Sequence, residues 1–125
     1  MIYTTYFAKL KKLPDSIIPI AICAKPPNGY TGLIYRPLAP KYDFFTKYKI
    51  NGDKEEFTDN YIGQVLNQLN TASVVTNLYY QAGLAPNTRD IALVCFEKSA
   101  DFCHRHLVAD WLREAGYNCE EWSEN

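Results

Sequence analysis

The segment that most constrains the fold is a continuous apolar run, residues 91–96, followed by a short polar loop and an amphipathic stretch. A run without alternation is typical of a central parallel strand that is covered on both faces. The amphipathic stretch predicts a helix that ends at Gly116. Its inward-facing stripe consists of Leu107, Val108, Trp111, Leu112 and Ala115. Ser99 and Asp101 are both candidates for the residue that caps its start. The sequence therefore predicts a strand–loop–helix unit.

Three other segments are predicted to be strands. Residues 2–7 and 17–23 are rich in β-branched and aromatic side chains, and residues 117–121 form a short edge strand. We predict an α/β fold, with a single compact domain in which a largely parallel sheet of about four strands is flanked by helices in a Rossmann-like manner. Only about ten residues connect the first two strands, which is near the minimum for a parallel crossover, so their relative direction stays open.

Two helices are predicted between the second strand and the apolar run. Asp53 begins a capping box, and the apolar spacing after it continues to about Asn70. A second helical segment starts at Thr71 or Ser73 and stops at Gly83.

Residues 25–52 form the segment with no persistent period, and they contain prolines, glycines, aromatic residues and basic residues. The aromatic content argues against disorder. We therefore expect an irregular excursion within the domain. It either packs over an edge of the sheet or serves as a lid, since basic and aromatic side chains suit phosphate binding and base stacking.

Size and charge exclude several classes of protein. A chain of 125 residues is one domain, and it has no apolar run long enough to span a bilayer. The first residues lack the pattern of a signal peptide, so we expect a cytoplasmic protein with no membrane partner. The net charge is −1, with +6 on residues 1–50 and −7 on the remainder. This distribution argues against indiscriminate DNA coating but permits a local anion-attracting surface.

The four cysteines, Cys23, Cys95, Cys103 and Cys119, form no Cys-x-x-Cys pair. A zinc ribbon or a thioredoxin motif is therefore not indicated. We expect reduced thiols, as is usual in the cytosol.

Six reactive or charged side chains fall between the apolar strand and the last helix, where α/β folds bind ligands. They are Cys95, Glu97, Lys98, Cys103, His104 and Arg105. The helical phase places His104 inward and His106 in solvent.

Each of these residues has a functional and a structural interpretation. Cys95, Cys103, His104 and Glu97 are the candidate catalytic residues. The alternatives are that both cysteines only pack, that His104 is a core histidine bonded to a carbonyl, and that Glu97 pairs with a nearby charge.

Three cations are the candidate ligand-binding residues. Arg105 is predicted to clamp an anion, or else to form a salt bridge with Glu97 or Asp101. Lys98 and, on the basic run after the first strand, Lys9 are further candidates, although such runs are usually solvated.

The motif Cys-Phe-Glu-Lys at 95–98 with Cys-His-Arg at 103–105 resembles the signature of domain-of-unknown-function family 488, small bacterial, archaeal and phage-borne proteins. Residues 6–14, 17–23 and 38–41 are similar to a short subgroup of that family. The resemblance implies a compact α/β domain with these residues at one site, and it implies no particular reaction.

No motif for a cofactor is present, and we expect none. We also expect no metal, because adjacent Cys103 and His104 should diverge on a helix. The leading hypothesis is an enzyme acting on a small anionic substrate that is phosphorylated or nucleotide-like, or on a nucleic acid. The alternatives are a non-catalytic module that binds an anion, a nucleotide or a nucleic acid, and an accessory protein that binds a protein partner.

Overall fold

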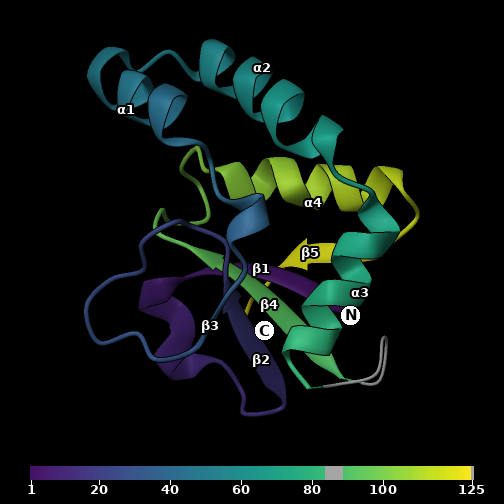
Figure 1. Ribbon diagram of the computed structural model, residues 1–125. Coiled ribbons are helices and arrows are strands. Elements are labelled where there is room, and N and C mark those ends of the chain that lie inside the picture. Colours follow the sequence, from purple (N-terminus) through teal and green to yellow (C-terminus); the bar gives the residue numbers. More distant parts are fainter. Residues whose placement is uncertain (84–88, 125) are drawn as a thin grey trace.

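A single parallel sheet organises the computed structural model, which describes residues 1–83 and 89–124 (Figure 1). The strand order is β3-β2-β4-β1-β5, and every pairing is parallel. The strands are β1 (Ile2–Tyr6), β2 (Ile17–Ala21), β3 (Leu33–Ile34), β4 (Asp90–Cys95) and β5 (Cys119–Glu121). The predicted α/β fold with a parallel sheet is confirmed, and the sheet gains β3 as a fifth strand.

β4 lies in the middle of the sheet, as its apolar sequence predicts. Its Leu93 pairs with Thr4 of β1 on one side and with Ile20 of β2 on the other. The residues from Ile91 to Cys95 are all buried. Because β1 and β2 both run parallel to β4, they are parallel to each other, which resolves the direction that the sequence left open. A 3-10 helix, η1 (Phe7–Lys12), connects them.

The helices form successive layers on the sheet. α4 (His104–Glu114) packs against β1, β4 and β5, α2 (Lys54–Gln64) packs against α4, and α1 (Tyr42–Asn51) packs against α2. Figure 1 shows α1 and α2 beyond α4, on the side away from the sheet. α3 (Thr71–Gln81) and two short 3-10 helices, η2 (Arg36–Leu38) and η3 (Leu66–Gln68), complete the chain.

Local capping explains where two of these helices begin. The Asp53 carboxylate accepts a hydrogen bond of 3.0 Å from the Glu56 amide, as expected of the capping box at the start of α2. Asn70 caps α3 through a bond of 2.9 Å from the Ser73 amide. The helix predicted to continue to Asn70 instead ends at Gln64 and is followed by η3.

Two predictions about local structure are wrong. Neither Ser99 nor Asp101 caps α4, because both lie in a turn before the helix, and the N-cap residue is Cys103, with φ −154° and ψ 146°. Residues 25–52 are not irregular throughout, since they contain β3, η2 and α1. α1 ends at Gly52, whose φ of 64° lies in the left-handed region that glycine adopts without strain.

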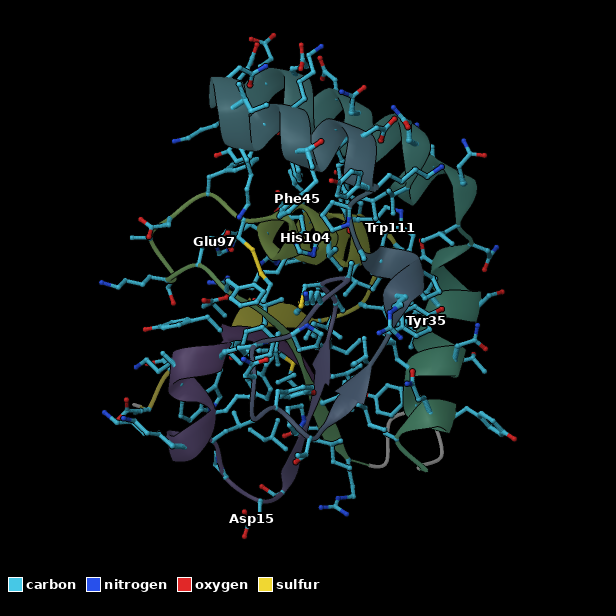
Figure 2. All side chains as sticks on the ribbon, turned by 60° about the vertical axis from the view of Figure 1, so that its left-hand side comes forward. Asp15, Tyr35, Phe45, Glu97, His104 and Trp111 are labelled. Atoms are coloured by element: carbon cyan, nitrogen blue, oxygen red, sulfur yellow. A yellow bond between two sulfur atoms is a disulfide. The ribbon has the colours of Figure 1, made fainter. Side chains whose placement is uncertain are left out.

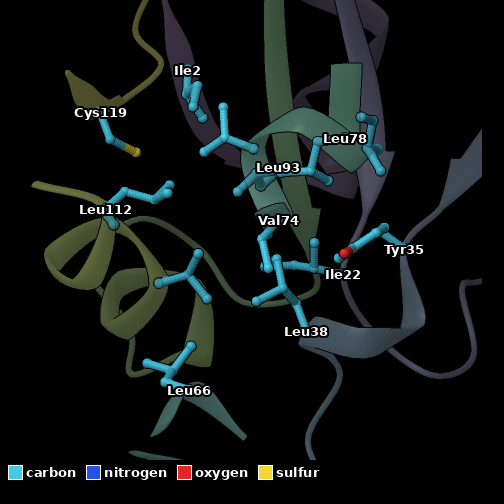
Figure 3. Close-up of a cluster of buried hydrophobic side chains, with 14 of the residues drawn as sticks. Ile2, Ile22, Tyr35, Leu38, Leu66, Val74, Leu78, Leu93, Leu112 and Cys119 are labelled. Atoms are coloured by element: carbon cyan, nitrogen blue, oxygen red, sulfur yellow. The ribbon is translucent and has the colours of Figure 1, made fainter. Parts of the chain in front are cut away.

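The hydrophobic core joins the sheet to the helices (Figure 3). Ile2 and Leu93 of the sheet cluster with Leu112 of α4, Leu78 of α3 and Leu38 of η2, all at most 3 % exposed. This packing holds the amino-terminal end of α4 beside the carboxyl end of β4. Among the described residues, no helix has the length and apolar character needed to cross a membrane.

Candidate functional site

Two sulfur atoms and one imidazole meet at the carboxyl end of β4 (Figure 2). Cys95 is the last residue of β4, Cys103 is the N-cap residue of α4, and His104 is the first residue of that helix. The two sulfur atoms are bonded as a disulfide, and Nδ1 of His104 lies 3.8 Å from Sγ of Cys103. All three side chains are buried. Their placement at one site is what the helical phase of His104 and the position of β4 predict.

The disulfide overturns the expectation that all four cysteines are reduced. Cys95 and Cys103 are 8 residues apart in sequence. The loop between them brings the start of α4 back to the end of β4, so that the two sulfur atoms meet. Cys23 and Cys119 are free and buried. Burial raises the pKa of the Cys23 thiol and raises that of Cys119 to about 11. Both free cysteines are therefore neutral thiols near pH 7.

His104 is oriented by the main chain of Ile22, the residue that follows β2. Its Nε2 lies 2.7 Å from the carbonyl oxygen of Ile22, and because a carbonyl only accepts, Nε2 carries the hydrogen. Nδ1 is then the nitrogen with a free lone pair, on the side of Cys103. Burial lowers the pKa of His104 to about 4, so the imidazole is neutral near pH 7. A neutral imidazole with a defined lone pair can accept a proton or coordinate a metal.

Arg105 is fully buried, and other groups of the protein occupy its guanidinium. Nε and Nη2 donate to the two carboxylate oxygens of Glu121, at 3.1 Å and 2.8 Å. Nη1 donates to the carbonyl oxygen of Glu97 at 2.6 Å and contacts Sγ of Cys95 at 3.2 Å. The ring of Tyr6 lies 5.6 Å from the guanidinium carbon. The planar fork is therefore not open to a ligand, and the salt bridge forms with Glu121, not with Glu97 or Asp101.

Glu121 is a residue that the sequence reasoning missed. Besides Arg105, its carboxylate accepts hydrogen bonds of 2.6 Å from the hydroxyls of Thr4 and Ser99. Burial by itself would raise the pKa of Glu121, but the hydrogen bonds from Arg105, Ser99 and Thr4 outweigh it and lower the pKa. No sequence signal links Glu121 to the site, because β5 is brought beside Arg105 by its pairing with β1 and its packing against α4.

A cavity of about 540 Å³ opens beside the disulfide and His104. Its lining comes from the segment after β2, from Pro40 and α1, from the end of β4, and from the start of α4. The lining residues are Cys23, Ala24 and Lys25 after β2, Pro40, Tyr42, Phe45, Thr46 and Lys49 before and within α1, Cys95, Phe96 and Glu97 at the end of β4, and His104 of α4. Phe45, Glu97 and His104 lie close together in Figure 2. Residues 25–52 thus form one side of the cavity.

The remaining predicted site residues are placed differently from one another. Glu97 is exposed and lines the cavity. Lys98 is exposed in the loop before α4 and is not among the described residues that line it. Lys9 lies in η1 and forms an ion pair of 2.9 Å with Glu124, also outside this cavity. Lys25 and Lys49 are the cations that the cavity does contain.

The prediction that His106 lies in solvent is wrong. The side chain is half-buried, and among the described residues its buried Nε2 has no hydrogen-bond partner. The helix begins only at His104, so His106 lies in its first turn.

The argument that Cys103 and His104 diverge is also wrong. It assumed that both residues are helical, but Cys103 is extended and only His104 has entered α4. The ligand atoms of Cys95, Cys103 and His104 all lie within 4.8 Å of one another. These three residues could therefore hold a metal ion.

Comparison with known proteins identifies a family. Residues 3–116 match the family model DUF488-N3a, which is described as the active DUF488-N3 subclade. No curated protein and no solved structure matches the chain. The family match includes the whole unit from β4 to α4 that carries the Cys-Phe-Glu-Lys and Cys-His-Arg motifs. Since it spans most of the sequence, the protein belongs to the DUF488-N3a family, a subclade of DUF488-N3.

Proposed function

We propose that the protein is a thiol-dependent enzyme that acts on a small phosphorylated or nucleotide-like substrate. The observation that carries this proposal is that Cys95 lines the cavity and that its sulfur lies against both the Arg105 guanidinium and the Cys103–His104 pair. The reduced form of the site is the active one. In the disulfide form Cys95 cannot form a thiolate, because its sulfur is bonded to Cys103.

Arg105 supports Cys95 as the reacting thiol. A guanidinium 3.2 Å from a sulfur atom stabilises the thiolate, which is the nucleophilic form of cysteine. Arg105 thus acts through Cys95 and not through the substrate. His104 is neutral, and its Nδ1 is placed to take the proton of the Cys103 thiol.

The chemical step follows from this placement. The Cys95 thiolate forms a bond to an electrophilic atom of the substrate, and the leaving group departs with the electron pair of the broken bond. Water then hydrolyses the adduct and regenerates the thiol. The Glu97 carboxylate, which lines the same cavity, is the candidate general acid and base for the leaving group and the water.

The lining of the cavity supports an anionic substrate with a flat apolar part. Lys25 and Lys49 supply positive charge for a phosphate. Tyr42, Phe45 and Phe96 are 81 %, 37 % and 50 % exposed, so their rings are accessible for stacking on a base. Together these groups favour a nucleotide, or the end of a single-stranded nucleic acid, over a simple phosphate. We place this activity in the cytoplasm, where cellular dithiols keep Cys95 and Cys103 reduced.

The proposal is tested by measuring thiol reactivity and ligand binding together. The reduced protein should be alkylated by iodoacetamide at Cys95, and a nucleotide that binds in the cavity should slow that alkylation. Cys23→Ser is the matched control, because Cys23 lines the same cavity but lies outside the disulfide pair. If Cys95 reacts only after unfolding, or if nucleotides give no protection at any concentration, the proposal is rejected.

A non-catalytic binding module is the second candidate function. It is favoured by the burial of Cys95, Cys103 and His104, which is also what packing residues show. A nucleotide would then bind equally well to wild type and to Cys95→Ser, with no product formed by either. An accessory protein would bind a partner through the exposed side chains of α1, such as Ile50 at 89 % exposure.

A further inference from the structure

We infer that the reduced Cys95–Cys103–His104 cluster binds one thiophilic divalent cation, with Zn²⁺ as the best chemical match. The protein ligands are Sγ of Cys95, Sγ of Cys103 and Nδ1 of His104. A fourth position faces the cavity and takes water or a ligand. The cluster is the one used in the proposed function, but the inference concerns metal binding and holds whichever reaction the site performs.

The donor set and its spacing suit such an ion. The three ligand atoms lie within 4.8 Å of one another, so a single cation can reach them all. Two thiolates and one imidazole form a soft set of the kind that zinc prefers, at distances of about 2.3 Å for sulfur and 2.0–2.1 Å for nitrogen. Breaking the disulfide frees the two sulfur atoms to move apart to the spacing that the ion requires.

His104 is already oriented as a metal ligand. Histidines that bind metals usually donate their other ring hydrogen to a carbonyl or a carboxylate, which fixes the tautomer and the ring plane. The bond between His104 Nε2 and the Ile22 carbonyl, 2.7 Å long, provides this orientation and leaves Nδ1 for the ion. The edge-to-face contact with Tyr61, at 5.4 Å between ring centres, restricts the imidazole further.

The charges around the cluster balance when a dication is bound. Two thiolates compensate the two positive charges of the ion. Arg105 adds a cation 3.2 Å from the Cys95 sulfur, but the Glu121 carboxylate already neutralises it through an ion pair of 2.8 Å. The contact from Arg105 to the sulfur can then persist as an N–H···S hydrogen bond to a metal-bound thiolate.

The cavity determines where the fourth position lies. Cys95 and His104 both line the cavity of about 540 Å³, whereas Cys103 is not among its lining residues. An ion held by all three residues therefore keeps an open position on the cavity side. Three protein ligands with one open position are the arrangement of catalytic zinc sites, while structural sites have four protein ligands.

The disulfide and the metal site exclude each other. A dithiol reductant supplies two electrons and two protons, which convert the disulfide into two thiols, and the reductant is itself oxidised to a disulfide. Binding the cation then displaces two protons from Cys95 and Cys103. The same chain thus provides its own control, because the oxidised protein keeps its fold but lacks both thiolates.

The test is a titration of the reduced protein with Co²⁺, which replaces Zn²⁺ and absorbs visible light. We expect one equivalent to bind, with the thiolate-to-cobalt absorption in the near ultraviolet and the visible bands of a tetrahedral ion. Zn²⁺ should displace it. The oxidised protein should bind at least tenfold more weakly. Equal binding by both forms, or no binding near one equivalent, would overturn the inference.

Single variants identify the ligands. Cys95→Ser, Cys103→Ser and His104→Gln should each weaken binding at least tenfold and change the cobalt spectrum. Cys23→Ser and His106→Gln are the matched controls and should bind as the wild type does. Circular dichroism checks that each variant is folded. If a variant does not fold, the test of the site is the comparison between the reduced and the oxidised wild type. An unchanged spectrum in both cysteine variants would assign the metal to other residues and reject the site.

The experiments distinguish a failure of the metal-binding inference from a failure of the proposed thiol-dependent function. If one Zn²⁺ binds and protects Cys95 and Cys103 from iodoacetamide, the inference stands even where the metal-free protein shows no thiol-dependent activity. If no metal binds but metal-free Cys95 is alkylated and nucleotides protect it, the inference is overturned while the proposed function is supported.

Discussion

The carboxylate of Glu121 holds the guanidinium of Arg105 through two hydrogen bonds, 3.1 Å and 2.8 Å long. Arg105 is fully buried, and the side chain of Glu121 is 24 % exposed. The pair joins the last strand to the first turn of α4. It also places the guanidinium against the Cys95 sulfur, so Arg105 contacts the site through Cys95.

Arg105→Ala should destabilise the fold. Its removal leaves the partly buried Glu121 carboxylate without its charged partner. Breaking a fully buried ion pair costs about 3–5 kcal/mol. Because Glu121 is 24 % exposed, we expect a somewhat smaller loss of about 2–4 kcal/mol. Arg105→Lys should recover little of this, because a lysine cannot form the two parallel bonds. Urea denaturation measures the change. Lys47→Ala is the control: its ion pair with Glu56, 3.3 Å long, lies at the surface with the lysine 61 % exposed, and the loss should stay below about 1 kcal/mol.

The stability of the pair should depend on acid pH. The folded state lowers the pKa of Glu121 below its ordinary value of 4.5, so the stabilisation is fully present above that pH. It is lost as the pH falls through the lowered pKa of the folded state. Wild type should therefore lose more stability than Glu121→Gln between pH 5 and pH 3. Parallel urea midpoints in the two proteins over this range would contradict the prediction.

Oxidation of Cys95 and Cys103 should stabilise the protein. Closing a loop with a sequence separation of 8 restricts the unfolded chain by about 2–3 kcal/mol in the chain-entropy treatment. Denaturation of the wild type with and without a reductant measures this difference. The double variant Cys95→Ala/Cys103→Ala has no disulfide to reduce, so the reductant should change its stability by less than about 0.5 kcal/mol.

His104 and His106 should respond oppositely to substitution. His104→Ala leaves the Ile22 carbonyl without its donor and opens a gap, so we expect a loss of about 2–3 kcal/mol. His106→Leu removes a buried nitrogen that has no partner among the described residues, and it should be neutral or slightly stabilising. Thermal unfolding of both variants decides this. A larger loss for His106→Leu would mean that its Nε2 has an important contact.

Replacing the two cavity lysines should weaken nucleotide binding. The double variant Lys25→Ala/Lys49→Ala removes both cations of the cavity lining, and calorimetry should report a loss of about 1.5–3 kcal/mol for a charge-assisted contact. Lys9→Ala/Lys98→Ala is the matched control, because neither lysine lines the cavity. If the control pair weakens binding more than the cavity pair does, the phosphate lies elsewhere.

The sequence by itself determined the elements whose signals are local. The apolar run of β4 predicts a buried central strand, and the Asp53 side chain caps α2 within three residues. The inward position of His104 also follows from helical phase alone. α1 escaped notice because only Phe44 of its ten residues is buried, which leaves hardly any apolar period. The glycine at position 52 is the local signal for the end of α1, and the structure shows it there with a positive φ.

Only the tertiary structure decided which residues meet at the site. Ile22 and His104 are 82 residues apart, and Glu121 meets Arg105 because β5 pairs with β1 and packs against α4. The bond between Cys95 and Cys103 depends on the path of the loop that joins β4 to α4. Local sequence fixes which face of a strand or helix a side chain occupies. Which partner meets it there depends on strand order and helix packing, and these are properties of the whole chain.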